Sequence, residues 1–189
     1  MNPASLQIQK FDDFLPPDEL ARSIEFAKSI RWRFGWTSTG SKTVEQSKYW
    51  HVDFDGHVDS QNTDSVVDLL TDPFIRDLWQ RLAQGPCRGH TPIRCYANGH
   101  TYGVPGAPHI DRKQDGYWSL VFYANARWDP AWAGETVFYD RTGDLCHASL
   151  PRPNRLVVFP SNIVHAARPV EQHCTSLRMC YVFKTKAPQ

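Results

Sequence analysis

The chain lacks the features that would place it in a membrane, in a secreted fraction or on nucleic acid. No apolar run approaches the roughly 20 residues that a membrane-spanning helix needs, and the N-terminus has no basic patch followed by an apolar stretch. The 21 basic and 20 acidic residues leave a formal charge of +1, so no net field favours nucleic acid or an anionic membrane. We therefore expect a soluble protein whose partner is neither nucleic acid nor membrane.

Cysteine is present, but not in a pattern that builds a disulfide framework or a zinc knuckle. The five cysteines are an odd number and include no CxxC pair. Free, buried or half-buried thiols in a reducing compartment are the simpler interpretation. We therefore expect a cytoplasmic protein.

Repeats, low-complexity tracts and linkers are also missing, which favours one domain over residues 1–189. With 189 residues and 41% hydrophobic content, the chain can bury one substantial core and is short for two. Amphipathic patterns predict helices over Pro17–Ile30 and Pro73–Gln84, with a short helix over Ser65–Leu70.

From Ile93 onward, short runs rich in β-branched and aromatic residues are separated by Gly, Pro, Asn and Asp. Helices followed by many strands predict an α+β, mainly β arrangement, a sheet sandwich with the helices packed on one outer face. The expected strands are Ile93–Ala97, Tyr117–Ala124, Glu135–Tyr139, Arg155–Phe159, Ala166–Val170 and Thr175–Lys184.

Residues 31–60 follow neither the helical nor the strand pattern. They carry aromatic residues among polar ones, namely Trp32, Phe34, Trp36, Tyr49 and Trp50. Loops of this kind commonly cover a site, so we predict a lid or a groove here.

The tripeptide HxD occurs three times, at His51, His57 and His109. Residues i and i+2 of an extended segment point the same way, so each copy can present both side chains to one ion. Of the three copies, only His109 and Asp111 follow a turn-forming stretch that leads from one expected strand to the next. His165 comes soon after an apolar strand that ends at Phe159 and Pro160. Two imidazoles and one carboxylate leave three metal positions open, the ligand set of a mononuclear non-heme iron(II) oxygenase.

Arg178 lies in the last expected strand among small and apolar neighbours. A buried arginine is costly unless an anion meets it. Its guanidinium can hold the distal carboxylate of a dicarboxylate whose 2-oxo acid end chelates the metal; the alternative is a structural ion pair with Asp or Glu. Tyr123 can assist Arg178 or simply pack in the core, and alternation alone does not separate the two.

At this point the motifs resemble a known family. From Ile93 to Phe183 the chain is similar to the iron(II)- and 2-oxoglutarate-dependent dioxygenases of the prolyl 4-hydroxylase-like group. The resemblance rests on motifs in the family's order, and it covers about half of the chain: Arg94–Gly99, His109–Asp111, Asp115–Asn125, Gly134–Phe138, Arg155–Pro160, His165 and Pro169–Val170.

The resemblance implies a double-stranded β-helix, also called a jelly roll or cupin-like fold, with N-terminal helices on one sheet. Residues 1–90 would be helical support and lid, and residues 91–186 the catalytic core. The implied roles are iron ligation by His109, Asp111 and His165, binding of 2-oxoglutarate by Arg178 and Tyr123, and a place in the co-substrate pocket for Tyr96. Cys180 departs from the family, which usually has Ser or Thr two residues after the arginine. Asp111 favours oxygen transfer, because related halogenases have Gly or Ala there.

The expected reaction is hydroxylation, or another oxidation, of an unactivated C–H bond, coupled to decarboxylation of 2-oxoglutarate to succinate with Fe(II) and O2. A small molecule such as an amino acid or natural-product intermediate is the expected substrate, since no extra domain is present to hold a polypeptide. Peptidyl prolyl 4-hydroxylation is one alternative, and a cupin-like metal-binding module without turnover is another. The oligomeric state is not legible from the sequence. The expected substrate-binding residues are Trp36, Trp50, His51 and Asn98.

Overall fold

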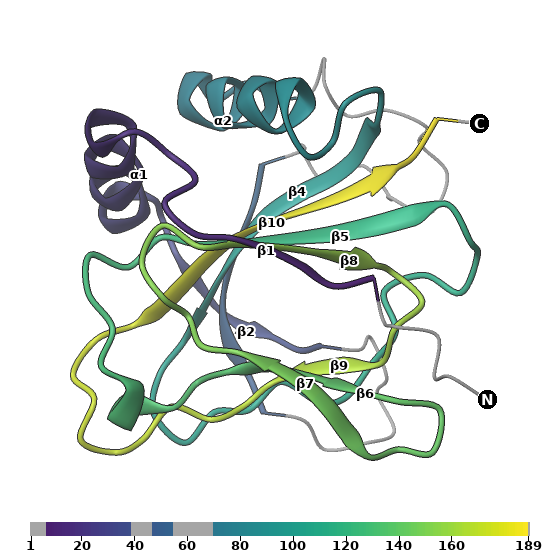
Figure 1. Cartoon of the computed structure of the whole chain (residues 1–189). Coiled ribbons are helices and arrows are strands. Elements are labelled where there is room, and N and C mark those ends of the chain that lie inside the picture. The colour runs from purple at the N-terminus through teal and green to yellow at the C-terminus, as the bar shows by residue number, and fades with distance from the viewer. Residues whose placement is uncertain (1–6, 39–46, 55–69, 189) are drawn as a thin grey trace.

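The computed structural model of the chain describes residues 7–38, 47–54 and 70–188. Two antiparallel sheets face each other, and the two α-helices of the described residues cover the outside of the larger sheet (Figure 1). The larger sheet has seven strands in the order β1-β8-β5-β10-β4-β3-β2, and the smaller has three in the order β7-β6-β9. This architecture is the predicted jelly roll.

The strands are β1 (Gln9–Phe11), β2 (Arg33–Trp36), β3 (Tyr49–Asp53), β4 (Thr91–His100), β5 (Tyr117–Tyr123), β6 (Thr136–Tyr139), β7 (Leu145–Ser149), β8 (Leu156–Pro160), β9 (His165–Ala167) and β10 (Arg178–Lys186). A 3-10 helix, η2 (Pro130–Trp132), precedes β6.

The helices α1 (Pro17–Ser29) and α2 (Pro73–Gln84) confirm the two long helices predicted from the sequence. Proline occupies the first turn of each helix, where its missing N–H costs nothing. The side chain of Asp72 caps α2 by accepting hydrogen bonds from the backbone N–H groups of Phe74 and Ile75. Neither helix of the described residues is long and apolar enough to cross a membrane.

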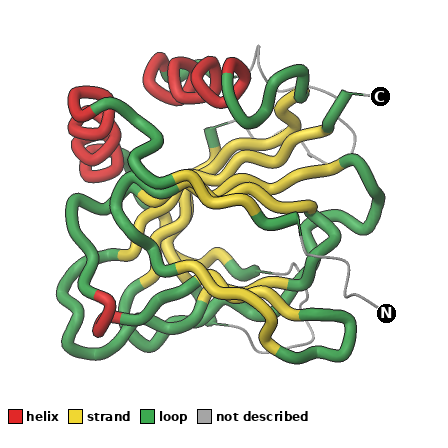
Figure 2. The backbone as a smooth tube through the Cα atoms, viewed as in Figure 1, coloured by secondary structure: helices red, strands yellow, loops and turns green. Residues whose placement is uncertain are grey.

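Strict alternation along the central strands of the larger sheet creates two separate cores. On β10, Tyr181 and Phe183 face the helices, whereas Cys180 and Val182 face the smaller sheet. The strands β4, β5 and β8 follow the same rule. Figure 2 shows both α-helices on the outer side of the larger sheet, so they leave its inner face uncovered.

Residues 31–60 show no clear helical or strand pattern in the sequence, yet the part of them that the structure describes contains two strands. β2 and β3 extend the larger sheet at its edge, and β1 and β7 were also missed. All four residues of β2 are exposed and one is Gly35, so the segment shows no buried alternation. The predicted short helix over Ser65–Leu70 lies outside the described residues except for Leu70.

Asn154 clamps the N-terminal segment to the turn that leads into β8. It is 5% exposed, and its φ of 59° lies in the left-handed region. Its side chain accepts a hydrogen bond of 2.8 Å from the backbone N–H of Leu15 and donates one of 2.8 Å to the Leu15 carbonyl.

Replacing Asn154 with Ala should lower the free energy of unfolding by about 2–4 kcal/mol, because two buried backbone groups lose their partners. Urea denaturation measures the loss. Asn154→Gly also loses both hydrogen bonds, but glycine adopts the left-handed backbone angle without strain. The difference in unfolding free energy between the two variants therefore measures the cost of that backbone angle for alanine. A loss below about 0.5 kcal/mol in both would contradict the clamp.

Candidate metal and co-substrate site

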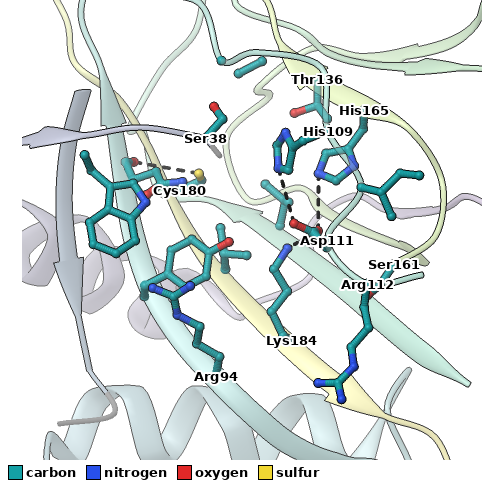
Figure 3. Close-up of a pocket in the computed structure, with 18 of the residues that line it drawn as sticks. Ser38, Arg94, His109, Asp111, Arg112, Thr136, Ser161, His165, Cys180 and Lys184 are labelled. Carbon is teal, nitrogen blue, oxygen red and sulfur yellow. Dashed lines mark hydrogen bonds and ion pairs between the residues drawn. The ribbon is translucent and has the colours of Figure 1, made fainter. Parts of the chain in front are cut away.

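A cavity of about 940 Å³ opens on the inner face of the larger sheet. Its walls come from β2, β3, β4, β5, β6, β9 and β10 and from the segment between β4 and β5 that carries His109 and Asp111. The volume lies in the upper part of the range typical of ligand pockets. Figure 3 shows the residues of its wall.

The two histidines of the predicted triad are tied together through their backbones. The N–H of His109 donates to the carbonyl of His165 at 3.0 Å, and the N–H of His165 donates back to His109 at 3.0 Å. The N–H of Asp111 donates to the carbonyl of Ser161 at 3.0 Å, at the end of β8. The segment before β5 is therefore fixed against the strand that carries the third ligand.

The donor atoms of the triad converge. His109 Nε2 lies 3.3 Å from Asp111 Oδ1, and His165 Nε2 lies 3.4 Å from Asp111 Oδ2. One ligand atom from each residue lies within 4.8 Å of those of the other two. Among the described residues this is the one group of His, Cys, Asp and Glu with such geometry.

The orientation of both imidazoles is fixed by a second hydrogen bond. His109 Nδ1 lies 2.8 Å from the carbonyl of Ala107, and His165 Nδ1 lies 3.0 Å from the carbonyl of Ile163. A carbonyl only accepts, so each Nδ1 carries the proton and each Nε2 keeps its lone pair for a metal.

Electrostatics keep the ligands in the protonation states that a metal needs. Burial by itself would raise the pKa of Asp111, but Lys184, His165 and His109 hold it well below its usual range. Burial lowers the pKa of His165 to about 4, outweighing the opposite effect of Asp111. A carboxylate and a neutral imidazole are the forms that ligate, so the donor set fits a divalent ion such as Fe(II).

Two donors from the larger sheet also hold the carboxylate of Asp111. Ser119 donates a 2.6 Å hydrogen bond to Asp111 Oδ2, and Lys184 Nζ makes a short contact with the same oxygen. Ser119 lies 2.8 Å from the hydroxyl of Ser161 and accepts a hydrogen bond of 3.2 Å from Lys184. These groups orient the carboxylate, as outer partners do at metal sites.

Arg178 lines the same cavity and is only 2% exposed. Its Nε donates to the carbonyl of Gly134 at 2.6 Å and one terminal nitrogen donates to Thr136 Oγ1 at 2.9 Å. The other lies 3.9 Å from the sulfur of Cys180. All of these partners are neutral, so the predicted alternative of a structural ion pair is not found among the described residues.

Gly134 is required for this placement. A Cβ at residue 134 would lie 3.3 Å from Cδ of Arg178 and 3.2 Å from both Trp128 and Val170, and the backbone has a φ of +76°. Glycine therefore lets the backbone approach the arginine closely.

The two tyrosines predicted near the co-substrate occupy different positions. Tyr96 lines the cavity, as expected. Tyr123 is fully buried and lies outside the lining; its ring is 5.2 Å from the guanidinium of Arg178 and its hydroxyl is 2.8 Å from Thr136 Oγ1. In this structure Tyr123 supports Arg178 and Thr136 from behind the cavity wall.

Two of the four residues predicted to bind substrate, Trp36 and Asn98, line the cavity, whereas His51 and Trp50 do not. Alternation on β3 turns Trp50 to the opposite face from His51. Trp36 stacks on His51 with ring centres 4.0 Å apart and covers it. The HxD of His51 is thus structural: its Nε2 is 3.1 Å from Asp53, which also accepts from Arg94. The third HxD, at His57, lies outside the described residues.

Residues 93–183 match the family model described as the 2OG-Fe(II) oxygenase superfamily. The matched part of the chain belongs to that superfamily. It is therefore an oxidoreductase, and the family uses Fe(II), 2-oxoglutarate and O2. No curated protein matches this oxygenase in sequence.

Several solved structures share the fold of this oxygenase. A prolyl-4-hydroxylase from Pseudomonas putida is 19% identical, with a TM-score of 0.60 and coverage of 98% of this chain and 95% of that one. A prolyl hydroxylase from Trichoplax adhaerens, solved with a hypoxia inducible factor peptide fragment, is 16% identical (TM-score 0.61, coverage 96% and 84%). HygX from Streptomyces hygroscopicus, solved with nickel and 2-oxoglutarate, is 10% identical (TM-score 0.67, coverage 97% and 84%). At these identities the likeness establishes the fold.

Sequence reasoning missed several polar residues of the oxygenase site. Lys184 shares the inner face of β10 with Arg178, and continued alternation would have found it. Ser119 shares the inner face of β5 with Tyr123 and could have been found in the same way. Arg94 and His100 share a face of β4 with Tyr96 and Asn98, which the sequence analysis had placed near the site, so alternation could have found them as well.

The triad yields a prediction for metal affinity. His109→Ala or Asp111→Ala should weaken Fe(II) binding by more than about 100-fold, because each removes one of three ligands. Ser119→Ala removes only an outer partner and should weaken binding about 10-fold. Anaerobic competition titration measures the affinities. His51→Gln, in the structural HxD, is the matched control and should retain the wild-type affinity for Fe(II). Equal losses of affinity in all four variants would contradict the assignment of the triad as the metal ligands.

His100 provides a pH probe in the same cavity. It is 3% exposed, and its Nδ1 lies 3.2 Å from the carbonyl of Val104. Burial, with a smaller contribution from the positive charge of Arg178, lowers its pKa to about 3 from an ordinary value of 6.5.

The unfolded chain therefore takes up a proton at His100 near pH 6.5, which the folded chain accepts only near pH 3. Because the unfolded state binds more protons in this window, folding stability should fall as the pH drops below 6.5, by up to about 1.4 kcal/mol per pH unit. Urea unfolding of the metal-free protein across this window measures the slope. His100→Gln should show a smaller slope, and an unchanged slope would mean that His100 is not buried as a neutral group.

Proposed function

We propose that the protein is an Fe(II)- and 2-oxoglutarate-dependent dioxygenase that hydroxylates, or otherwise oxidises, an unactivated C–H bond of a small molecule. The reaction would consume O2 and convert 2-oxoglutarate to succinate and carbon dioxide. Natural-product intermediates and amino acids are the substrate classes that we favour. The chain would work as one domain, with residues 91–186 as its catalytic core.

The observation that carries this proposal is the placement of Arg178 and the triad in one cavity. A buried guanidinium with only neutral partners needs an anion to offset its desolvation. A dicarboxylate supplies this anion at one end and two oxygen donors for a metal at the other. The shared cavity, the triad and the arginine therefore support this proposal together.

The roles of the residues follow from their positions. His109, Asp111 and His165 would hold iron, which would supply the activation of dioxygen for the coupled oxidation. Arg178, backed by Tyr123, would bind the far carboxylate of 2-oxoglutarate, and the hydroxyl of Thr136 would donate beside it. Tyr96 lies on the same wall and would limit the space for the co-substrate.

The size of the cavity supports a small substrate. About 940 Å³ accommodates 2-oxoglutarate together with a second molecule of modest size. SnoN, an epimerase from nogalamycin biosynthesis described as alpha-ketoglutarate dependent, has the same fold with a TM-score of 0.61. That protein is 14% identical to this chain, so oxidation of a natural-product intermediate is our hypothesis for this chain.

Peptidyl prolyl hydroxylation is the second candidate. The edge strand β2 exposes Phe34 and Trp36, and Trp36 lines the cavity, so an extended peptide can use this edge. O2-dependent succinate release with amino acids and metabolites as substrates, compared with proline-containing peptides, separates the two candidates. Release stimulated only by the peptides would overturn the small-molecule proposal. A metal-binding module without turnover is disfavoured by membership of an oxygenase family.

Arg178→Ala should raise the half-saturating concentration of 2-oxoglutarate by about 10–100-fold, because charge-assisted hydrogen bonds worth about 1.5–3 kcal/mol are lost. The titration follows the weak visible charge-transfer band, expected at about 500 nm, of the anaerobic Fe(II) complex. Arg152→Ala, at a side chain 62% exposed, is the control. An unchanged half-saturation in Arg178→Ala, or no band with metal bound in the wild type, would contradict the proposed function.

A further inference from the structure

A pair of cations in addition to Arg178 lies on the inner face of the larger sheet, at the opposite end from that arginine. Lys184 of β10 and Arg94 of β4 are direct cross-strand partners, whereas Arg178 pairs with His100 at the other end of the same ladder. The six residue steps from Arg178 to Lys184 correspond to about 20 Å along the strand. One molecule of 2-oxoglutarate held by Arg178 would leave this pair to another ligand.

Both cations lie against aromatic rings in the wall of the cavity. The guanidinium of Arg94 is 4.7 Å from the ring centre of Tyr96 and 5.3 Å from that of Trp36. Lys184 Nζ is 5.8 Å from the ring centre of Tyr96. Figure 3 shows Lys184 pointing towards Asp111, with Arg94 below the neighbouring ring. A group bound by Lys184 would therefore lie directly beside the metal ligands.

The charges of the residues that line the cavity do not balance. Among the described lining residues, five are cationic and one, Asp111, is a carboxylate; the cations are Arg94, Arg112, Lys113, Arg178 and Lys184. Like charges directly opposite each other in a sheet destabilise it. Asp53 accepts from Arg94 outside the lining, so one cation has a partner there.

Asp111 is the acidic partner of Lys184. In the proposed function, which this inference extends, Asp111 shares its charge with a divalent metal. The ammonium group then has less compensation, in a position only 13% exposed. A negatively charged group that enters from the cavity would compensate the charge of the ammonium group again.

We propose that Lys184 and Arg94 form an oxyanion subsite that binds a carboxylate or phosphate group of the primary substrate. A compact ammonium and a planar guanidinium, side by side on adjacent strands, can donate to different oxygens of one such group. The aromatic rings of Trp36 and Tyr96 form the apolar wall beside it. The enzyme would thereby select acidic small molecules and place the anionic group near the metal, with the reacting carbon a short distance from that group.

The test uses protein loaded with Zn(II) and saturated with 2-oxoglutarate, so that no turnover occurs and Arg178 is occupied. The probes are acetate, inorganic phosphate, N-acetylglycine and its neutral amide, and the readout is the apparent Kd from thermal stabilisation. The wild type should bind N-acetylglycine or phosphate at least ~10-fold more tightly than the amide. Comparing the apparent Kd of acetate and N-acetylglycine with that of phosphate distinguishes a subsite for carboxylates from one for phosphates.

Lys184→Gln keeps a donor for Asp111 but removes the charge, and it should abolish the preference for the anionic probes. Lys184→Arg should restore it. Arg94→Gln tests the other cation independently and keeps a donor for Asp53. It should weaken the binding of the anionic probes at least ~3-fold. Arg152→Gln is the exposed control and should behave as the wild type.

No preference for anionic probes in the wild type, or an equal preference in Lys184→Gln, would overturn the subsite. The Fe(II) and 2-oxoglutarate charge-transfer band is recorded for each protein in parallel. A normal band without anion preference rejects the subsite and leaves the proposed function standing, whereas absence of the band in the wild type rejects the proposed function itself.

Discussion

The period-two alternation of β10 is the constraint on which the rest of the structure depends. Its odd-numbered residues, including Tyr181 and Phe183, pack under the helices, while its even-numbered residues face the smaller sheet. A shift of one residue would place Arg178 and Lys184 in the apolar core under α1 and α2. The apolar face therefore fixes the register, and the register places both cations in the cavity.

Asp111 joins this sheet to the second layer. Its carboxylate meets two imidazoles held through paired backbone hydrogen bonds and also two donors from the large sheet, Ser119 and Lys184. Burial of so many polar groups is costly unless each is satisfied. The network is thus organised around an acidic centre whose two oxygens face different partners, and a divalent ion would complete the side that the imidazoles occupy.

Sequence reasoning captured the parts of this arrangement that alternation and turn chemistry determine. The two long helices and the six buried strands have a clear apolar face, and the order of the motifs singles out His109, Asp111, His165 and Arg178. Two of the missed strands lack such a face: β2 is exposed throughout and β7 is largely exposed. Their pairing depends on contacts with distant segments, which no local pattern records.

The same reasoning failed where one element shields another. His51 has the correct spacing with Asp53 and lies on the same face of β3 as Tyr49, which lines the cavity. Trp36, from a strand that the sequence did not reveal, stacks over His51 and removes it from the cavity. Tyr123 is likewise on the inner face, but Thr136 of the opposite sheet stands between its hydroxyl and the open space.

The two inward-facing cations of β10 differ in chemistry as well as in position. Arg178 is fixed by the Gly134 carbonyl and Thr136, so its planar fork is presented in one orientation, which suits a carboxylate of constant geometry. Lys184 is a compact charge on a flexible stem, and its partner Asp111 is shared with the metal site. A rigid fork suits a co-substrate that is the same in every turnover. In our proposal the ammonium of Lys184 binds the anionic group of a second molecule, and the order of cations along β10 would separate the site for the co-substrate from the site for the substrate.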